Sequence, residues 1–206
     1  ALEEERRRVL PVIEHLASCG VPVSVDTWKP ELMLEAIAAG ASMVNDINAL
    51  GAPGAMEAVA GSGAAVCLMH KQGDPKTMQV NPSYQDVVRE VRDYLAGRVA
   101  AAERAGIIRD RIVVDPGFGF GKNVEHNLAL LRSLREIRAL GVALMAGLSR
   151  KAMLGKLTGR EPQERVHASV AAALLAVQNG AHIVRAHDVA ATRDALAVWQ
   201  AVEKRD

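Results

Sequence analysis

The chain of 206 residues is 50% apolar, carries a formal net charge of +1 and contains only 3% aromatic residues. A nearly neutral chain gives no reason to expect nucleic acid or an acidic membrane surface as a partner, and so few aromatic rings offer little stacking area for bases. No apolar run approaches the ~18 residues that suggest a membrane span. A chain of this length can bury a substantial core, and we expect residues 1–206 to form a single domain.

The two cysteines give no disulfide framework. Cys19 closes a predicted helix and Cys67 lies within an apolar run. Both suit the role of small hydrophobic side chains in a reducing compartment, so we expect a cytoplasmic protein.

Apolar spacing divides the chain into alternating helices and strands. The first helix has Glu3, Glu4 and Glu5 at its positive end and contains Pro11, which is expected to kink or restart it. In chain order the predicted elements are helix 2–18, strand 21–27, helix 30–40, strand 43–47, helix 54–60, strand 64–70, helix 84–104, strand 111–115, helix 123–139, strand 143–149, helix 162–178, strand 182–187 and a last helix from 190.

This strict alternation predicts an α/β fold, a parallel sheet with helices packed outside it. Six strand–helix units are present. A closed (β/α)₈ TIM barrel has eight strands and about 250 residues, so this fold requires that the first two βα units lie outside the sequence. The chain opens without Met and directly on a helix, and we expect it to be an amino-terminally incomplete fragment of such a barrel. Length alone favours the alternative, a complete six-stranded doubly wound sheet.

The most distinctive stretch is the loop 115–122, Asp-Pro-Gly-Phe-Gly-Phe-Gly-Lys, between a predicted strand and a predicted helix. Its three glycines let the backbone approach a flat ligand, and Asp115 and Lys122 supply opposite charges at its two ends. A phosphate-binding GxxxxGK[ST] loop would need glycine in place of Pro116 and a hydroxyl residue in place of Asn123. A flexible turn without a ligand is the structural alternative.

Side chains alternate across a strand, so polar residues two positions apart near each carboxyl end share one face. The face that would point inward carries Asp26, Asn45, Ile47, Met69, Asp115, Gly147, Ser149, Arg185 and His187, with Lys151 two residues after Ser149. Singly, Asp26 suits a helix cap, Asn45 or Asp46 a turn, and Lys151 a solvated charge. Jointly, charged groups rarely face an apolar interior unless they meet a ligand or one another. Pairing of the aspartates with arginine or lysine remains the structural alternative.

Asp26, Asn45 and Asp115 offer the donors and acceptors that bind the edge of a polar heterocycle. Its flat faces would be covered by Ile47, Met69 and Phe120. The cationic groups, which lie near predicted helix amino termini, suit an anion such as phosphate or pyrophosphate. They are Lys151, Arg185 and His187.

No residue of the chain is predicted to bind a metal directly, and nothing resembles a nucleophile and base triad. The other histidines lack metal-ligand spacing such as HExxH and are interpreted as packing or surface residues. They include His70, His126, His167 and His182.

With these residues identified, the chain resembles the dihydropteroate synthases of the pterin-binding barrel superfamily over essentially its whole length. The motifs that carry the resemblance are Ser-Val-Asp-Thr-Trp-Lys-Pro at 24–30, Val-Asn-Asp-Ile at 44–47, Met-His at 69–70 with Gly-Asp-Pro-Lys-Thr-Met-Gln at 73–79, the loop 115–122, Ser-Arg-Lys at 149–151 and Arg-Ala-His-Asp-Val at 185–189.

The resemblance implies a transferase of folate biosynthesis, with 7,8-dihydropterin-6-ylmethyl diphosphate and 4-aminobenzoate as substrates, Mg²⁺ as cofactor, a homodimer and a sulfonamide target. By family roles the catalytic residues are Asp26, Asp115 and Lys151. The substrate-binding residues are Asn45, Ile47, Met69, Phe120, Gly147, Ser149, Arg185 and His187. The family's first strand, whose Asn helps to hold the metal, has no counterpart in the sequence. The alternatives are a pterin domain of the methyltransferase type and a catalytically inactive pterin-binding paralogue.

Overall fold

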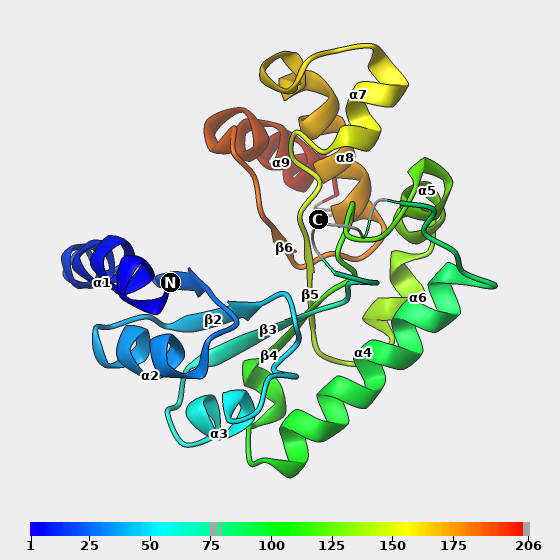
Figure 1. Cartoon of the computed structure of the whole chain (residues 1–206). Helices are drawn as coiled ribbons and strands as arrows, with labels where there is room; N and C mark the ends of the chain where they lie inside the picture. Colours follow the sequence, from blue (N-terminus) through cyan, green and yellow to red (C-terminus); the bar gives the residue numbers. More distant parts are fainter. Residues whose placement is uncertain (75–77, 79, 204–206) are drawn as a thin grey trace. The chain divides into compact units, whose positions relative to one another are not determined.

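The computed structural model describes residues 1–74, 78 and 80–203. The chain forms two compact units, one comprising Ala1–Lys71 with Asp93–Asp115 and the other comprising Gln72–Arg92 with Pro116–Asp206. In both units strands alternate with helices (Figure 1).

The first unit is a four-stranded parallel sheet with helices packed against it. Its elements are α1 (Leu2–Ala17), β1 (Ser24–Asp26), α2 (Pro30–Ala38), β2 (Met43–Asp46), α3 (Ala55–Ala60), β3 (Ala65–Met69), the part of α4 (Val87–Arg104) that starts at Asp93, the 3₁₀ turn η1 (Arg109–Arg111) and β4 (Ile112–Asp115). The strands pair in sequence order, β1 with β2, β2 with β3 and β3 with β4. One register row is fully aliphatic and buried, and consists of Val25, Val44, Val66 and Ile112. Of the helices in this unit, α2 contacts the sheet at β2.

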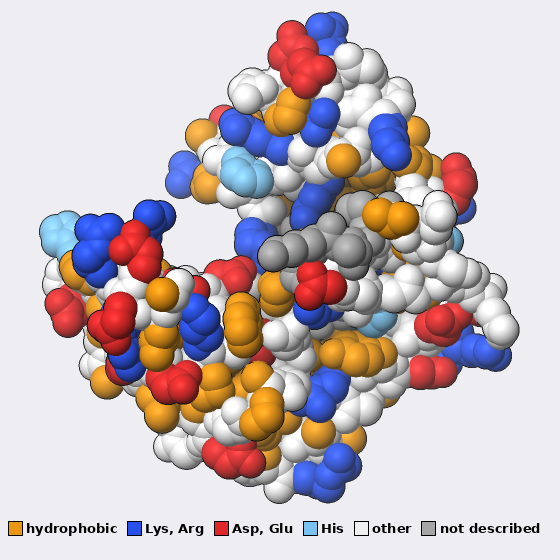
Figure 2. All heavy atoms as spheres, in the orientation of Figure 1, with side chains coloured by type: hydrophobic (Ala, Val, Ile, Leu, Met, Phe, Trp, Pro, Cys, Tyr) orange, Lys and Arg blue, Asp and Glu red, His pale blue; other side chains and the backbone are white. Residues whose placement is uncertain are grey.

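The helix α1 lies against α2 through ion pairs as well as apolar contacts. Arg6 forms a bidentate pair with Glu35 of α2, and Lys29 pairs with Glu5 at 2.5 Å. Acidic and basic side chains are intermixed over α1 in Figure 2. The face of α1 that this view shows therefore carries no patch of a single charge.

The second unit carries the last two strands and most of the remaining helices. Its elements are α5 (Val124–Arg132), α6 (Leu134–Arg138), β5 (Ala143–Ala146), α7 (Ala152–Thr158), the 3₁₀ turn η2 (Pro162–Glu164), α8 (Val166–Gln178), β6 (Ile183–Val184) and α9 (Val189–Glu203). The strands β5 and β6 are parallel. The helix α8 packs against α7, α9 and β6.

Six parallel βα units confirm the barrel prediction rather than the doubly wound sheet. In a doubly wound sheet the strand order reverses, so that the first strand lies between the second and a later one. Here the first four strands lie side by side in sequence order. That order is typical of the (β/α)₈ barrel, in which each strand pairs with its neighbours along the chain.

The predicted helices differ from the structure in several places. Helix 123–139 is two helices, because the chain breaks at Ser133 with φ −104° and ψ 20°. The helix α1 continues through Pro11 instead of restarting there. The short helix α7 was not predicted, since its centre is Gly155, a weak helix former. A tertiary contact explains that glycine, because a Cβ there would lie 2.2 Å from the guanidinium of Arg165. Within the described part of the chain, no helix has both the length and the apolar composition needed to cross a membrane.

Candidate active site

In the first unit, Asp26 and Asn45 lie side by side at the carboxyl ends of β1 and β2. The strand register pairs Asp26 with Asn45 and Asn45 with Cys67, so these side chains share one face as predicted. The amide Nδ2 of Asn45 donates to Oδ2 of Asp26 at 2.7 Å. Asn45 is 3% exposed whereas Asp26 is exposed. The carboxylate is therefore oriented by a buried amide and lies at the surface of this unit.

Met69 and Asp115 form the next register row of the same face. They are paired across β3 and β4, and each side chain is 1% exposed. The backbone N–H of His70 donates to the carbonyl of Asp115 at 3.0 Å, which extends the strand pairing by one residue. Ile47 follows β2 directly and is half-buried. A buried carboxylate beside a thioether suits the heterocycle that the sequence predicts as ligand, because the carboxylate can bind its polar edge and the thioether can cover its apolar face.

Asp46, next to Asn45, is a structural residue, as the turn alternative predicted. Its carboxylate accepts backbone hydrogen bonds from Asn48 at 2.7 Å and Leu50 at 2.8 Å. Burial raises the pKa of the Asp46 carboxyl, and the two hydrogen bonds oppose that shift. The guanidinium of Arg98 donates to the carbonyls of Ala49 and Leu50, which both have positive φ. This turn fixes the end of β2, where Asn45 and Ile47 lie.

In the second unit, the glycine-rich loop is held by its own lysine. Gly117, Gly119 and Gly121 all have positive φ, between 64° and 81°. Lys122 is 2% exposed, and its Nζ donates to the carbonyls of Gly117 and Phe120, both at 3.0 Å. The expectation that Lys122 presents a charge at the end of the loop is thus corrected. Its ammonium group is buried because the loop carbonyls bind it.

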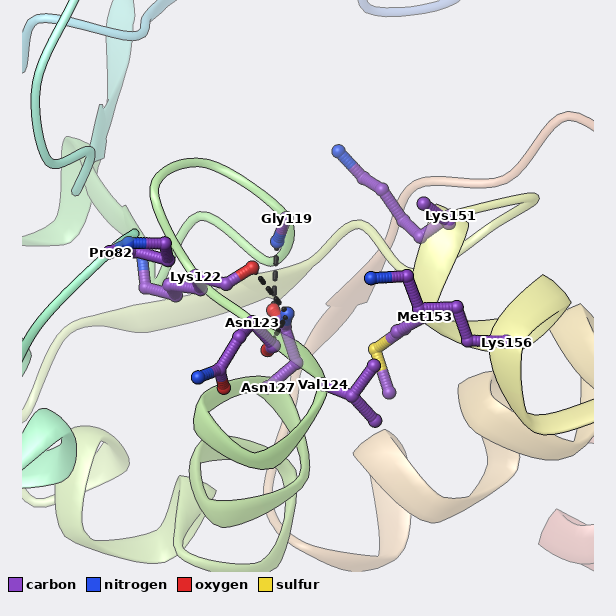
Figure 3. A pocket seen from close by; sticks show the side chains of 10 residues that line it. Pro82, Gly119, Lys122, Asn123, Val124, Asn127, Lys151, Met153 and Lys156 are labelled. Atoms are coloured by element: carbon purple, nitrogen blue, oxygen red, sulfur yellow. Dashed lines mark hydrogen bonds between the residues drawn. The ribbon is translucent and has the colours of Figure 1, made fainter. Parts of the chain in front are cut away.

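Asn127, one turn into α5, fixes the same loop from the helix side (Figure 3). Its Oδ1 accepts from the N–H of Gly119 at 2.8 Å. Its Nδ2 donates to the carbonyls of Asn123 at 2.6 Å and Lys122 at 3.3 Å. The side chain is 2% exposed. The sequence shows that Asn127 follows Asn123 by four residues, but it does not show which groups Asn127 binds.

Phe120 lies against Lys151, two predicted site residues that are 31 positions apart. The Nζ of Lys151 lies 4.3 Å from the centroid of the Phe120 ring, a cation–π distance. Lys151 is the residue that precedes α7. Beside this pair is a cavity of about 400 Å³, shown in Figure 3. Its lining includes Gly119, Asn127, Lys151, Ala152, Met153 and Lys156.

The ends of β5 and β6 meet through two further pairs of predicted residues. Ser149 Oγ accepts from the backbone N–H of His187 at 3.1 Å and lies 3.0 Å from its Nδ1. A Cβ at Gly147 would lie 2.9 Å from the guanidinium of Arg185. Gly147 therefore leaves room for the guanidinium to lie across β5. Arg185 and His187 are exposed, as anion-binding groups must be.

An ion pair that was not predicted joins these two strand ends. Arg150 forms two hydrogen bonds to the carboxylate of Asp188, at 2.7 and 3.1 Å. The Arg150 guanidinium lowers the pKa of the Asp188 carboxyl below its ordinary value. Both residues belong to motifs singled out in the sequence, but a separation of 38 positions leaves no local signal for their pairing.

The described residues contain no group of three or more His, Cys, Asp or Glu side chains that could hold a metal ion. The donor set therefore does not by itself form a magnesium site. Three of the histidines interpreted as packing residues have structural partners. His70 packs edge-to-face on Tyr94, His126 completes the cap of α5, and His182 Nδ1 accepts from the N–H of Leu144.

Part of one motif cannot be placed. Gly73, Asp74 and Met78 are described, whereas residues 75–77 and 79 of the same motif lie outside the described residues. All the predicted catalytic and substrate-binding residues are described. Within the units, all of them except Ile47 form pairs: Asp26 with Asn45, Met69 with Asp115, Phe120 with Lys151, Gly147 with Arg185 and Ser149 with His187.

Comparison with known proteins identifies the family. Residues 1–187 match the family model described as "Pterin binding enzyme". The chain is 48% identical over 202 residues to dihydropteroate synthase of Escherichia coli K12, covering 98% of this chain and 72% of the relative. It superposes on dihydropteroate synthase of Stenotrophomonas maltophilia with a TM-score of 0.97 and 56% identity, covering 100% of this chain and 78% of that one.

The enzyme of Xanthomonas albilineans is similarly close and has been solved with two ligands. Its complex with 7,8-dihydropteroate matches with a TM-score of 0.94 and 53% identity, and the alignment covers 100% of this chain and 75% of that one. Its complex with 4-aminobenzoic acid matches with a TM-score of 0.95 and 54% identity, covering 100% and 74%. By sequence and by structure, the chain belongs to the pterin-binding enzyme family and, within it, to the dihydropteroate synthases.

Proposed function

We propose that this protein condenses 7,8-dihydropterin-6-ylmethyl diphosphate with 4-aminobenzoate to give 7,8-dihydropteroate and pyrophosphate. The observation that carries the proposal is the match over the whole chain to an enzyme solved with 7,8-dihydropteroate and with 4-aminobenzoic acid. The pairs of predicted site residues support it, because their chemistry suits each part of these molecules.

The pterin ring is assigned to the residues at the ends of β1 to β4. Its heterocyclic edge presents donors and acceptors, which the carboxylates of Asp26 and Asp115 and the amide of Asn45 complement. The buried Met69 and the half-buried Ile47 supply apolar contacts for its faces. The hydrogen bond between Asn45 and Asp26 would hold the carboxylate in place before the substrate arrives.

The diphosphate is assigned to Arg185 and His187. A guanidinium offers two parallel N–H donors to phosphate oxygens, and an exposed imidazole adds a third donor. Ser149 fixes the His187 ring through its Nδ1, which leaves the other ring nitrogen for the anion. Lys151 is assigned to the aminobenzoate side, next to the cavity of about 400 Å³, and Phe120, which is predicted to cover a face of the pterin ring, lies against it.

The reaction forms a C–N bond and breaks a C–O bond at the pterin methylene. The diphosphate leaves with the electron pair of the C–O bond, so positive charge develops on the methylene and negative charge on the leaving group. Nearby carboxylates stabilise the first and the Arg185 guanidinium the second. The weakly basic amine of 4-aminobenzoate needs only positioning, and its proton is released to solvent after attack.

Magnesium remains a prediction, and no step is assigned to it. Mg²⁺ commonly binds through substrate phosphates with only one or two protein carboxylates. A metal that enters with the diphosphate is compatible with the lack of a three-ligand cluster among the described residues. Titration of the protein with inorganic pyrophosphate, with and without Mg²⁺, tests this prediction, since metal-independent affinity would contradict it.

The homodimer also remains a prediction. In the alanine-rich stretch 168–173 of α8, Ala172 and Ala173 are each 4% exposed and pack inside the chain, whereas Ala171 is exposed. Leu175, one turn further along the face of Ala171, is 48% exposed. A dimer contact through α8 would therefore involve the face of Ala171 and Leu175. Sedimentation equilibrium of the wild type and of Leu175→Glu tests this contact.

The proposed activity is tested by pyrophosphate release that depends on both substrates. We expect Asp26→Asn to lower kcat by about a hundredfold or more, because the carboxylate acts where charge develops. Asp110→Asn, an exposed aspartate in η1, is the matched control and should leave kcat unchanged. Pterin binding without pyrophosphate release would instead indicate an inactive paralogue. Methyl transfer from a folate would indicate the methyltransferase alternative.

A further inference from the structure

Two side-chain links join the segment after β5 to the segment after β6. Ser149 Oγ contacts both the backbone N–H and the ring of His187. One residue further along each segment, the guanidinium of Arg150 binds the carboxylate of Asp188 with two hydrogen bonds, Nε to Oδ2 at 3.1 Å and NH2 to Oδ1 at 2.7 Å. Two parallel bonds define the orientation as well as the distance of the pair. The side chains are 35% and 19% exposed, so water competes only partly for these bonds.

The backbone of Arg150 is held in an unusual conformation by α8. Its φ is +58°, in the left-handed region that residues with a side chain seldom adopt. Its N–H donates to Ser169 Oγ at 2.9 Å, and its carbonyl accepts from Arg165 NH1 at 3.0 Å. Ser169 Oγ in turn donates to the carbonyl of Arg165 at 2.7 Å. Such a conformation persists where the surrounding contacts determine it, and it occurs often at functional sites.

Asp188 is equally well anchored on the other segment. Its carbonyl accepts from the N–H of Thr192 at 3.1 Å and from Thr192 Oγ1 at 2.9 Å, at the start of α9. Thr192 is 5% exposed. The ion pair therefore connects two rigid supports, α8 through Arg150 and α9 through Asp188.

We propose that Arg150 and Asp188 are positioning residues that set the separation between the diphosphate-binding groups and the Lys151 ammonium. Arg150 lies between Ser149 and Lys151, and Asp188 follows His187 directly. This role rests on the proposed function and deepens it. Neither residue contacts a reacting atom, and the pair acts by fixing the distance and orientation between Lys151 and His187. Displacement of a catalytic group by about 1 Å lowers the rate by about a hundredfold. Loss of the ion pair should therefore affect turnover more than folding.

The first experiment compares Arg150→Met, Asp188→Asn and the double variant with the wild type. Each single variant should lower kcat about tenfold to a hundredfold and weaken binding of inorganic pyrophosphate, with a smaller change in the KM for 4-aminobenzoate. The double variant should be no worse than either single one, because both remove the same link. Arg109→Met is the matched control, since it breaks an Arg–Glu pair of the same 2.7 Å length between η1 and α4. It should leave kcat unchanged.

Two further variants separate positioning from a purely structural role. Arg150→Gly suits the positive φ but removes the guanidinium. It should lose as much activity as Arg150→Met, although its melting temperature should be less affected. Arg150→Lys keeps the charge without the second parallel N–H, so it should retain intermediate activity. These milder variants keep the proposal testable if Arg150→Met does not fold.

The outcomes distinguish this proposal from the proposed function. An active wild type with folded variants whose kcat stays within twofold would overturn the positioning role alone. Full activity of Arg150→Gly would overturn it too, since only the backbone conformation would then matter. A wild type that neither binds pyrophosphate nor turns over would refute the proposed function and the positioning role that depends on it.

Discussion

Replacement of Asn127 by alanine removes the side chain that fixes the glycine-rich loop to α5. Three hydrogen bonds are lost, one accepted from Gly119 and two donated to the carbonyls of Lys122 and Asn123. At about 0.5–1.5 kcal/mol each, they contribute about 1.5–4.5 kcal/mol to stability. The higher helix propensity of alanine returns about 0.5 kcal/mol. The expected net loss in the free energy of unfolding is about 2–3 kcal/mol, near the middle of this range. It includes the cost of leaving the N–H of Gly119 without this acceptor.

Asn123→Ala is the matched control at the same helix end. It removes only the cap, in which Asn123 Oδ1 accepts from the N–H of His126 at 2.9 Å. Loss of such a cap costs about 1 kcal/mol. The two variants therefore differ in whether the loop is released, while both change one asparagine at the start of α5.

Thermal denaturation and steady-state kinetics together test this prediction. Asn127→Ala should melt about 4–12 °C lower than the wild type, given about 2–4 °C per kcal/mol for a chain of this size. It should also raise the KM for 4-aminobenzoate, because Phe120 in the released loop loses its defined position over Lys151. Asn123→Ala should show a smaller stability loss and an unchanged KM. Equal stability losses in the two variants would refute the reasoning.

Three other predictions concern single positions. Gly121→Ala should destabilise the protein by more than about 2 kcal/mol in urea unfolding, because φ is +64° and the new Cβ would lie 2.4 Å from the carbonyl oxygen of Gln72. A variant that unfolds at the same urea concentration as the wild type would show that the loop can relax. Gly147→Ala should raise the KM for the pterin diphosphate with little change in stability, because its Cβ would displace the guanidinium of Arg185, only 2.9 Å away. An unchanged KM would contradict the role assigned to that guanidinium. The stability difference between the wild type and Asp188→Asn should be present at neutral pH and vanish as the pH falls below 3.8. The pKa of Asp188 is lowered from its ordinary value of 3.8 in the folded state, so its contribution is lost when the folded carboxylate is protonated. A difference that does not shrink as the pH is lowered below 3.8 in acid-unfolding curves would rule out this origin.

The sequence by itself determined which residues share a face. Side chains alternate along a strand for steric reasons that are local, so Asp26 and Asn45 could be placed together before any pairing was known. The register confirmed this placement. The alternation of strands and helices likewise specified a parallel sheet, and the family resemblance then selected the barrel, which the sequential strand order confirms.

Only the tertiary structure decided the partners of the charged and amide side chains. Lys122 was expected to present a charge at the end of its loop, but the folded loop surrounds its ammonium with carbonyls. Arg150 meets Asp188 across 38 positions, and Asn127 bonds a loop whose shape depends on glycines at positive φ. The physical reason is that periodicity depends on neighbouring residues, whereas the partner of a hydrogen-bonding group depends on which distant segments the fold brings within 3 Å of it.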